Sequence, residues 1–428
     1  MKDVDLHIKA LGVKGDGIAN IDFGKVFVPF TVPGDVVRVS LEKSKDRVRR
    51  AKVLSILEAG TERIESACRH FTKCGGCSVQ QLTNSSYQSW KQNIVYQALK
   101  RKNIDTSVLK NLIPGNPHTR RRIRVSALRL AKETVLGFRE RGSRRVVALE
   151  ECPVIINEIL GILPQLREFI SQTLKVGESG EIAITYTHTG LDITLFLPKE
   201  PSLANRERLA LFAETHDVSR INWNSFPSKF EQAAEPIVTR RVVTMEFGGV
   251  AVKIPPNAFV QPTAQGEKII REKITEVIGK AKRIVELFAG CGALALPLAS
   301  RGHHVSAFDL AENHIAALSL AARSNGIGER VRVQTRNLHR RPLLGSEFDK
   351  VDAVILDPPR GGAAEQATHL AASEVPVIAY VSCDPQSFAN DAEVLIAGGY
   401  NLINVMPFDQ FLWSSHVELI GIFEKINA

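Results

Sequence analysis

The C-terminal part of the chain alternates amphipathic helical segments with short apolar runs. After the helical segment KIIREKITEVI come five β-rich runs separated by helical segments: RIVELF, HVSAFD, RVRVQT, VDAVILD and VIAYVSC. Strands that alternate with helices form a mainly parallel sheet with helices on both faces. The last run, VELIGIFEK, is expected to end the sheet as an edge strand. The pattern predicts a Rossmann-like α/β domain over residues 251–428.

Residues 1–58 have a different pattern, in which short Val- and Ile-rich runs are separated by glycines. Several short strands at this spacing predict a small β-barrel of the oligonucleotide-binding type. Residues 66–250 are mixed, with a helix expected over residues 87–102 and a hairpin around Thr189 and Gly190. The apolar face of that helix could pack on the C-terminal domain. We therefore expect a barrel, a central α+β domain and an α/β domain, because 428 residues exceed one ordinary core.

Composition excludes several classes of protein. Hydrophobic residues make up 44% and charged residues 24%, which is ordinary for a folded globular chain. No run of eighteen apolar residues is present, and the first ten residues, MKDVDLHIKA, contain acids where a signal peptide needs an apolar stretch. We expect a cytoplasmic, monomeric protein with no membrane partner.

Charge points toward a polyanionic partner. The chain carries 55 Lys and Arg against 46 Asp and Glu, a net charge of +9. Seven basic residues lie between Arg38 and Lys52, and ten lie between Arg120 and Arg145. Either run alone is also typical of a solvated surface, but the two together favour nucleic acid.

Four of the six cysteines are separate from the α/β half: Cys68, Cys74, Cys77 and Cys152. A cytosolic protein rarely forms disulfides, so grouped cysteines indicate metal ligands or chemistry. Four thiolates can hold either a tetrahedral zinc ion or a 4Fe-4S cluster. The spacing does not distinguish the two.

Residues with chemical potential follow the predicted parallel strands. A glycine-containing loop, residues 288–292, follows the first strand, and Asp309 ends the second. Asp357 and Cys383 follow the fourth and fifth strands. Because open parallel sheets bind ligands at the carboxyl ends of their strands, we expect these side chains around one crevice. Taken alone, Cys383 could equally be a small buried hydrophobe.

The run from Gln261 through DPPRGG and SCDP to His416-Val417-Glu418 resembles the uracil-C5 RNA methyltransferases. The resemblance implies a class I methyltransferase fold and S-adenosylmethionine as methyl donor. It also implies that Cys383 is the nucleophile and Glu418 the general base. The residues expected around the cofactor are Gln261, Phe288, Asp309, Asn337 and Asp357. Three positions depart from the family pattern: Pro262 and Thr263 stand in place of Val-Asn, and Ala293 stands in place of a frequent Asn.

The rest of the chain resembles the same family. Residues 1–58 resemble a TRAM domain, and the segments CRHFTKCGGCSVQQL and LGFRERGSRRVVALEECPV resemble the iron–sulfur ligands of ribosomal RNA members. The resemblance implies a 4Fe-4S cluster on the four cysteines and 23S ribosomal RNA as substrate. Two alternatives stay open. One is uracil methylation in transfer RNA, although such relatives commonly lack the barrel and the cysteines. The other is a non-catalytic iron–sulfur protein that binds RNA.

Overall fold

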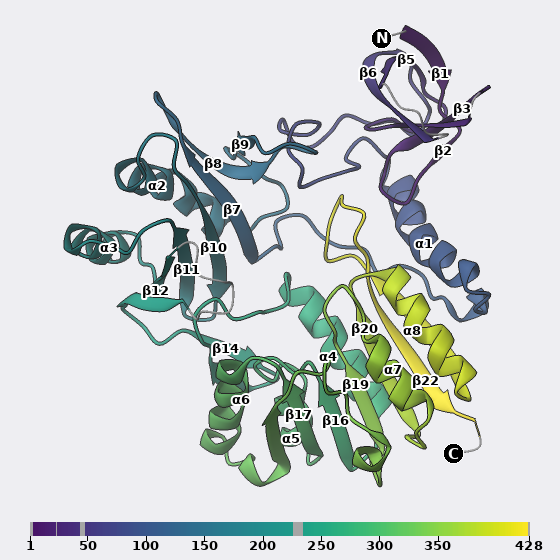
Figure 1. Ribbon diagram of the computed structural model, residues 1–428, viewed down its shortest axis with the longest axis vertical. Helices are drawn as coiled ribbons and strands as arrows, with labels where there is room; N and C mark the ends of the chain where they lie inside the picture. Colours follow the sequence, from purple (N-terminus) through teal and green to yellow (C-terminus); the bar gives the residue numbers. More distant parts are fainter. Residues whose placement is uncertain (1–2, 23, 43–47, 226–233, 427–428) are drawn as a thin grey trace.

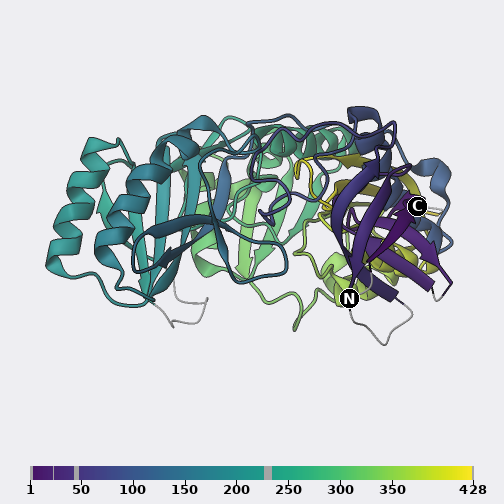
Figure 2. The ribbon, with the colours of Figure 1, turned by 90° about the horizontal axis from the view of Figure 1, so that it is seen from above.

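The computed structural model describes residues 3–22, 24–42, 48–225 and 234–426. Figure 1 shows three parts: a small barrel, a central sheet and a larger α/β unit. Seen from above, the barrel and helices α2 and α3 of the central part lie at opposite ends of the molecule (Figure 2). Lys43, Lys45 and Arg47 of the first basic run lie outside the described residues. Within the described part of the chain no helix is long and apolar enough to cross a membrane.

The N-terminal part is a curled six-stranded sheet in the order β1-β5-β6-β4-β3-β2. Its strands are β1 (Asp3–His7), β2 (Ala10–Leu11), β3 (Gly17–Ile21), β4 (Gly24–Val28), β5 (Val36–Leu41) and β6 (Val48–Glu58). The long β6 pairs with β5 and with β4, so the sheet folds back around a core of buried Ile8, Val26, Val28 and Val37. This agrees with the barrel expected from the glycine spacing.

The central part is a seven-stranded sheet in the order β13-β12-β11-β10-β7-β8-β9. Its strands are β7 (Arg122–Arg129), β8 (Thr134–Arg139), β9 (Val146–Ala148), β10 (Ser179–Thr187), β11 (Gly190–Leu197), β12 (Arg220–Ser225) and β13 (Glu235–Thr239). Helices α2 (Asn157–Thr173) and α3 (Leu203–Thr215) supply apolar side chains such as Ile159 and Leu209 to its core.

The α/β unit contains a seven-stranded sheet in the order β18-β17-β16-β19-β20-β22-β21. Its strands are β16 (Arg283–Leu287), β17 (His304–Asp309), β18 (Val331–Thr335), β19 (Ala353–Leu356), β20 (Val377–Ser382), β21 (Tyr400–Phe408) and β22 (Glu418–Lys425). The first five are parallel, and β22 runs antiparallel between β20 and β21. The order reverses between β16 and β19, where such sheets bind ligands.

The prediction that the last strand forms the sheet edge is wrong. Strand β22 pairs on both sides, and β21 is the edge strand. The first six residues of β22 are buried, as expected for an interior strand whose two faces and two edges are covered.

Helices cover both faces of this sheet. On one face lie α4 (Ala264–Ile278), α5 (Ala295–Ser300) and α6 (Glu312–Ser324), and on the other α7 (Ala364–Ala371) and α8 (Pro385–Ala397). The hairpin of β14 (Thr244–Phe247) and β15 (Val250–Lys253) spans the expected domain boundary at residues 250/251. Its buried Met245, Phe247 and Val252 belong to the core of the α/β unit.

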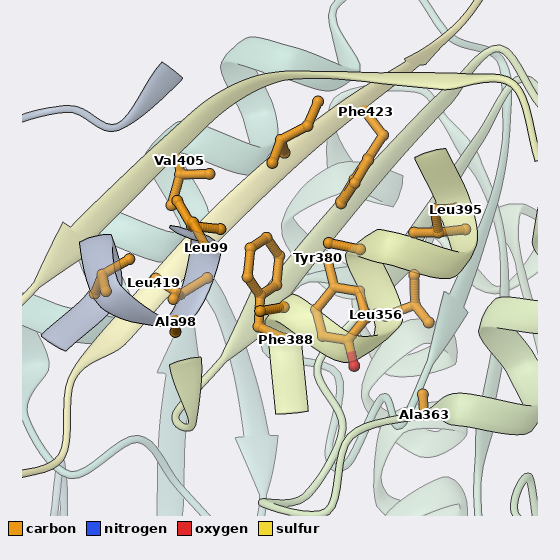
Figure 3. Close-up of a cluster of buried hydrophobic side chains, with 14 of the residues drawn as sticks. Ala98, Leu99, Leu356, Ala363, Tyr380, Phe388, Leu395, Val405, Leu419 and Phe423 are labelled. Atoms are coloured by element: carbon orange, nitrogen blue, oxygen red, sulfur yellow. The ribbon is translucent and has the colours of Figure 1, made fainter. Parts of the chain in front are cut away.

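Helix α1 (Asn84–Arg101) belongs to the α/β core, although its sequence lies far from that unit. Its Ala98 and Leu99 share one apolar cluster with Phe388 of α8, Val405 of β21 and Leu419 of β22 (Figure 3). In Figure 1 the helix lies between the barrel and α8. The segment that connects the barrel to the central sheet therefore contributes a helix to the core of the α/β unit.

Candidate active site

The ends of the inner strands bring Cys383 and Glu418 to the same edge of the sheet. Cys383 follows β20, and Glu418 begins the antiparallel neighbour β22. Because Ser382 pairs with Leu419, the start of β22 lies beside the end of β20. Asp357 follows β19, the strand on the other side of β20. The two residues expected to carry the chemistry are thus brought together with one predicted cofactor residue.

Cys383 occupies a short turn from strand to helix. Asp384 caps α8 by accepting hydrogen bonds from the backbone N–H groups of Gln386 and Ser387, both at 2.9 Å, and Pro385 is the first helical residue. Burial and the nearby Glu418 raise the pKa of the Cys383 thiol to about 11, whereas Arg360 acts in the opposite direction. The thiol is therefore neutral at physiological pH in the free protein.

Glu418 and Asp357 are joined by two amide side chains. Gln410 Nε2 donates to Glu418 Oε2 at 2.5 Å and to Gln261 Oε1 at 3.1 Å. Gln261 Nε2 in turn donates to Asp357 Oδ2 at 3.2 Å. Burial, followed by repulsion from Asp357, raises the pKa of Glu418 to about 8, and burial raises that of Asp357 to about 7. Such values suit a carboxylate that exchanges a proton near neutral pH.

The predicted cofactor loop is open toward the crevice. Phe288 and Gly290 have positive φ angles of 65° and 54°, and a Cβ on Gly290 would meet nothing within 4 Å. The Gly290 N–H donates to Asp309 Oδ2 at 2.9 Å, which ties the loop to the end of β17. Asn337 follows β18, and its Oδ1 accepts from the Arg340 N–H at 3.1 Å. The neighbouring His339 ring contacts Phe288.

A buried carboxylate that sequence reasoning missed also points to a cationic ligand here. Glu286 of β16 is only 2% exposed, and its Oε2 has no hydrogen-bond partner among the described residues. Burial and the nearby Asp357 and Asp309 raise its pKa well above the usual range. A crevice with three carboxylates and an open glycine loop fits S-adenosylmethionine, which carries a sulfonium, an ammonium group and a ribose.

Sequence reasoning missed Gln410, and it quoted Arg360 and His416 within their motifs without giving either a role. Arg360 could have been assigned one, because it follows Asp357-Pro358-Pro359 directly. Burial, with nearby Arg360 and Lys91, lowers the pKa of His416 to about 4, so the imidazole is neutral. Nothing local distinguishes Gln410, whose place depends on the pairing of Phe408 with Glu418 across β21 and β22.

The departure at Pro262-Thr263 has a structural explanation. The Thr263 hydroxyl accepts from the Gly266 N–H at 3.0 Å and so caps α4. Threonine and asparagine both serve as N-caps. The Pro262 carbonyl accepts from the Arg121 N–H at 2.9 Å. Neither residue interrupts the Gln261–Asp357 contact.

The four predicted metal-ligand cysteines line one cavity of about 290 Å³ beside the crevice. Arg120, Arg360, Phe411 and His416 line the same cavity. No group of three or more His, Cys, Asp or Glu side chains in the described residues is placed to hold a metal ion. A zinc ion would draw four sulfurs to about 2.3 Å from one point. Four thiols around one cavity are a donor set that either a zinc ion or a 4Fe-4S cluster can take.

Family comparison agrees with this geometry. Residues 243–426 match a family described as tRNA (Uracil-5-)-methyltransferase, and residues 4–61 match the TRAM domain of tRNA (uracil(54)-C(5))-methyltransferase. An RNA methyltransferase of Mesorhizobium japonicum is 38% identical over 98% of this chain and 97% of its own length. The chain belongs to the RNA uracil-5-methyltransferase family. The expectation of an enzyme of this S-adenosylmethionine-dependent family is confirmed.

Two further relatives span the whole chain. The 23S rRNA (uracil(1939)-C(5))-methyltransferase RlmD of Shewanella woodyi is 29% identical over 98% of this chain and 96% of its own length. The structure of Pyrococcus abyssi tRNA (uracil-54, C5)-methyltransferase with S-adenosyl-L-homocysteine has the same fold, with a TM-score of 0.74, 22% identity and coverage of 98% and 100%. The matched TRAM domain is that of a transfer RNA enzyme, so a barrel does not separate ribosomal from transfer RNA members.

Proposed function

We propose that this enzyme methylates C5 of a uridine in 23S ribosomal RNA, with Cys383 as nucleophile and Glu418 as general base. The observation that carries the proposal is the convergence of these two side chains at the edge formed by β20 and β22. The chemistry needs both groups. C5 of uracil is a weak nucleophile, and it becomes reactive only when a thiolate adds to C6 and forms an enolate.

In the proposed reaction the Cys383 thiolate adds to C6, and C5 then takes up the methyl group. S-adenosylmethionine supplies that methyl group as an electrophile. The Glu418 carboxylate then removes the C5 proton, which allows the Cys383–C6 bond to break and releases methylated RNA. The uridine must leave its stack before the thiol can reach C6.

The electrostatics support a crevice that is activated by its ligands. Burial raises the pKa values of Cys383, Glu418 and Asp357 in the free protein, and neighbouring carboxylates add to the increase for Cys383 and Glu418. A positive charge placed among them lowers all three values, because it favours the ionised forms. Gln261, Phe288, Asp309, Asn337 and Asp357 are proposed to surround the cofactor.

The choice of ribosomal RNA rests on the similarity to RlmD along the whole chain. Transfer RNA is the second candidate, favoured by the transfer RNA enzymes whose TRAM domain and fold the chain shares. Mapping 5-methyluridine in RNA from cells with and without the protein tests the choice. We expect one methylated uridine to disappear from 23S ribosomal RNA. Its disappearance from transfer RNA alone would replace our first candidate with the second.

We also propose that Cys68, Cys74, Cys77 and Cys152 hold a 4Fe-4S cluster. The support is the common cavity that they line and the resemblance of their segments to iron–sulfur ligands. Such a cluster would tie the loop before α1 to the segment after β9, since its ligands come from both.

Protein purified without oxygen is therefore expected to contain about four irons per chain and to be brown. Replacing Cys77 by serine should lower the iron content, because one of four thiolate ligands is lost. Iron and zinc analysis checks both results. One zinc per chain and no iron in the anaerobic preparation would contradict the cluster.

The proposed RNA surface includes only part of the two basic runs. Arg38 pairs with Asp5, Arg121 with Glu267 and Arg124 with Glu181, so these charges are partly neutralised within the protein. Arg122 pairs with no carboxylate in the described residues and lies over the exposed Phe259 ring at 5.2 Å. Burial and the neighbouring Arg124 and Arg120 lower its pKa to about 10, which still leaves it charged.

Arg122→Gln is expected to weaken RNA binding. It should also reduce the slope of log binding constant against log salt concentration by about the contribution of one phosphate contact. Binding measured over a series of salt concentrations checks the slope. Arg38→Gln is the matched control, because it removes an arginine already paired with Asp5. An equal slope for Arg122→Gln and the unchanged protein would show that Arg122 contacts no phosphate.

A further inference from the structure

A fully buried ion pair joins α1 to the loop between β21 and β22. Lys91 Nζ donates to Asp409 Oδ1 at 2.9 Å, and both side chains are 0% exposed. Lys91 also donates to the Phe411 carbonyl at 3.1 Å and to the His416 carbonyl. One lysine of α1 therefore binds the loop at two points near its start and at one near its end.

Tyr87, one helical turn before Lys91, adds a second connection. Its hydroxyl donates to Asp409 Oδ2 at 2.5 Å and accepts from the Trp413 N–H at 2.7 Å. Trp413 has a positive φ of 57°, a backbone conformation that a non-glycine residue adopts only when its surroundings hold it there. Tyr87 thus fixes the most constrained point of the loop.

The loop held in this way carries the groups around the proposed base. Asp409 is followed by Gln410, which donates to Glu418, and the loop ends at His416 and Val417. The pairing of Phe408 with Glu418 closes the loop at the mouth of the crevice. Any shift of the loop therefore moves Gln410 and the backbone that leads into Glu418.

Helix α1, which anchors the loop, is itself packed into the core. The face of α1 that carries Leu99 packs among Phe388, Val405 and Leu419 (Figure 3). On the other side of the loop, the Ser78 and Val79 N–H groups donate to the Trp413 carbonyl at 2.7 and 3.2 Å. In Figure 1 the loop, drawn in yellow, rises between α1 and the central part. It is therefore held from two sides.

We propose that Tyr87 and Lys91 are positioning residues that hold the loop of residues 409–417 so that Glu418 can remove the C5 proton. The inference rests on the proposed function, since it deepens the role of Glu418. Neither side chain touches the reacting atoms, and each acts through Asp409 and the loop backbone. A purely structural role would lower the amount of folded enzyme and leave the balance between reaction steps unchanged.

The test compares the rate at which the covalent species forms with the rate at which it breaks down. Tyr87→Phe removes only the hydroxyl, and in a single turnover with RNA and S-adenosylmethionine it should leave the formation of the covalent Cys383–RNA species nearly unchanged. Breakdown of that species to methylated RNA should slow at least about tenfold, because the variant loses both the hydrogen bond to the Asp409 carboxylate and the one accepted from the Trp413 N–H. Denaturing electrophoresis with labelled RNA measures both steps.

The matched control is Tyr400→Phe. Tyr400 lies at the other end of β21, is also buried, and its hydroxyl donates to the Val375 carbonyl at 2.9 Å, away from the loop. If Tyr87→Phe breaks the covalent species down as fast as Tyr400→Phe, the positioning role is overturned.

A second variant removes both charges of the Lys91–Asp409 pair, so that neither charge is left buried without its partner. Lys91→Met with Asp409→Asn deletes both ions and keeps a hydrogen-bond acceptor for Tyr87. We expect this double variant, with folding checked by thermal unfolding, also to accumulate the covalent species. A folded double variant that forms and breaks down the covalent species at unchanged rates overturns the role of Lys91.

If Glu418→Gln traps the covalent species and the variants of α1 do not, only this inference fails. If no Cys383-dependent species forms in any variant, the proposed function fails.

Discussion

Replacing Cys383 by alanine is expected to reduce methyl transfer at least about a thousandfold, because the thiolate that adds to C6 of uracil is removed. Binding of S-adenosylmethionine should persist, since the glycine loop and Asp309 lie at the ends of other strands. Methyl incorporation into RNA measures the first effect, and calorimetric titration of the cofactor measures the second.

Retained cofactor binding also serves as the folding control for this variant. Near-normal turnover of Cys383→Ala would remove Cys383 as the nucleophile. Cys291 would then be the next thiol to test, although it is only 3% exposed and burial raises its pKa to about 12.

Glu418→Gln is expected to block a later step and so to have a different outcome. The amide keeps the shape of the side chain but accepts no proton, so thiolate addition and methylation proceed while C5 keeps its proton. A covalent protein–RNA species that carries the methyl group should accumulate, and turnover should fall by about a hundredfold to ten-thousandfold. Denaturing electrophoresis with methyl-labelled cofactor detects it.

The double variant Cys383→Ala Glu418→Gln is the control, since it should form no such species. If Glu418→Gln alone turns over normally without a covalent species, another group removes the proton. That result would contradict the role of Glu418 and leave the role of Cys383 intact.

The order of strands could be predicted only in part. Apolar runs separated by helical segments indicated the parallel strands and placed Asp309, Asp357 and Cys383 at one edge, because each ends a strand of the same sheet. The place of β22 required knowledge of which strands pair, and pairing depends on contacts distant in sequence. An apolar strand such as β22 is equally compatible with several positions in the sheet until its neighbours are known.

The surroundings of the base were less accessible to sequence reasoning. Glu418 came from the resemblance to the family, because a single acid at a strand start has no local signature. Lys91 belongs to a helix whose polar positions usually face water, yet it is 0% exposed because Asp409, far along the chain, faces it. The role of Gln410 likewise depends on its hydrogen bonds to Gln261 and Glu418, which come from other parts of the chain. Pairs of this kind become visible only in three dimensions.

For the four cysteines outside the α/β half, in contrast, the sequence already indicated a common role. The sequence groups all four, with Cys152 as the fourth thiolate, and their spacing leaves only the nature of the ligand undecided. The fold places all four around one cavity, and that cavity also borders Arg360 and His416 of the crevice. Chain folding therefore joins two features that are separate in the sequence.

The most direct test of the central claim follows the hydrogen at C5. A 23S ribosomal RNA transcript labelled with tritium at C5 of uridine is incubated with the enzyme and with S-adenosylmethionine that carries a carbon-labelled methyl group. Methylation at C5 replaces that hydrogen, so we predict one tritium released for each methyl group transferred, and no release with Cys383→Ala. Methyl transfer without tritium release would place the methyl group on another atom and contradict the assignment.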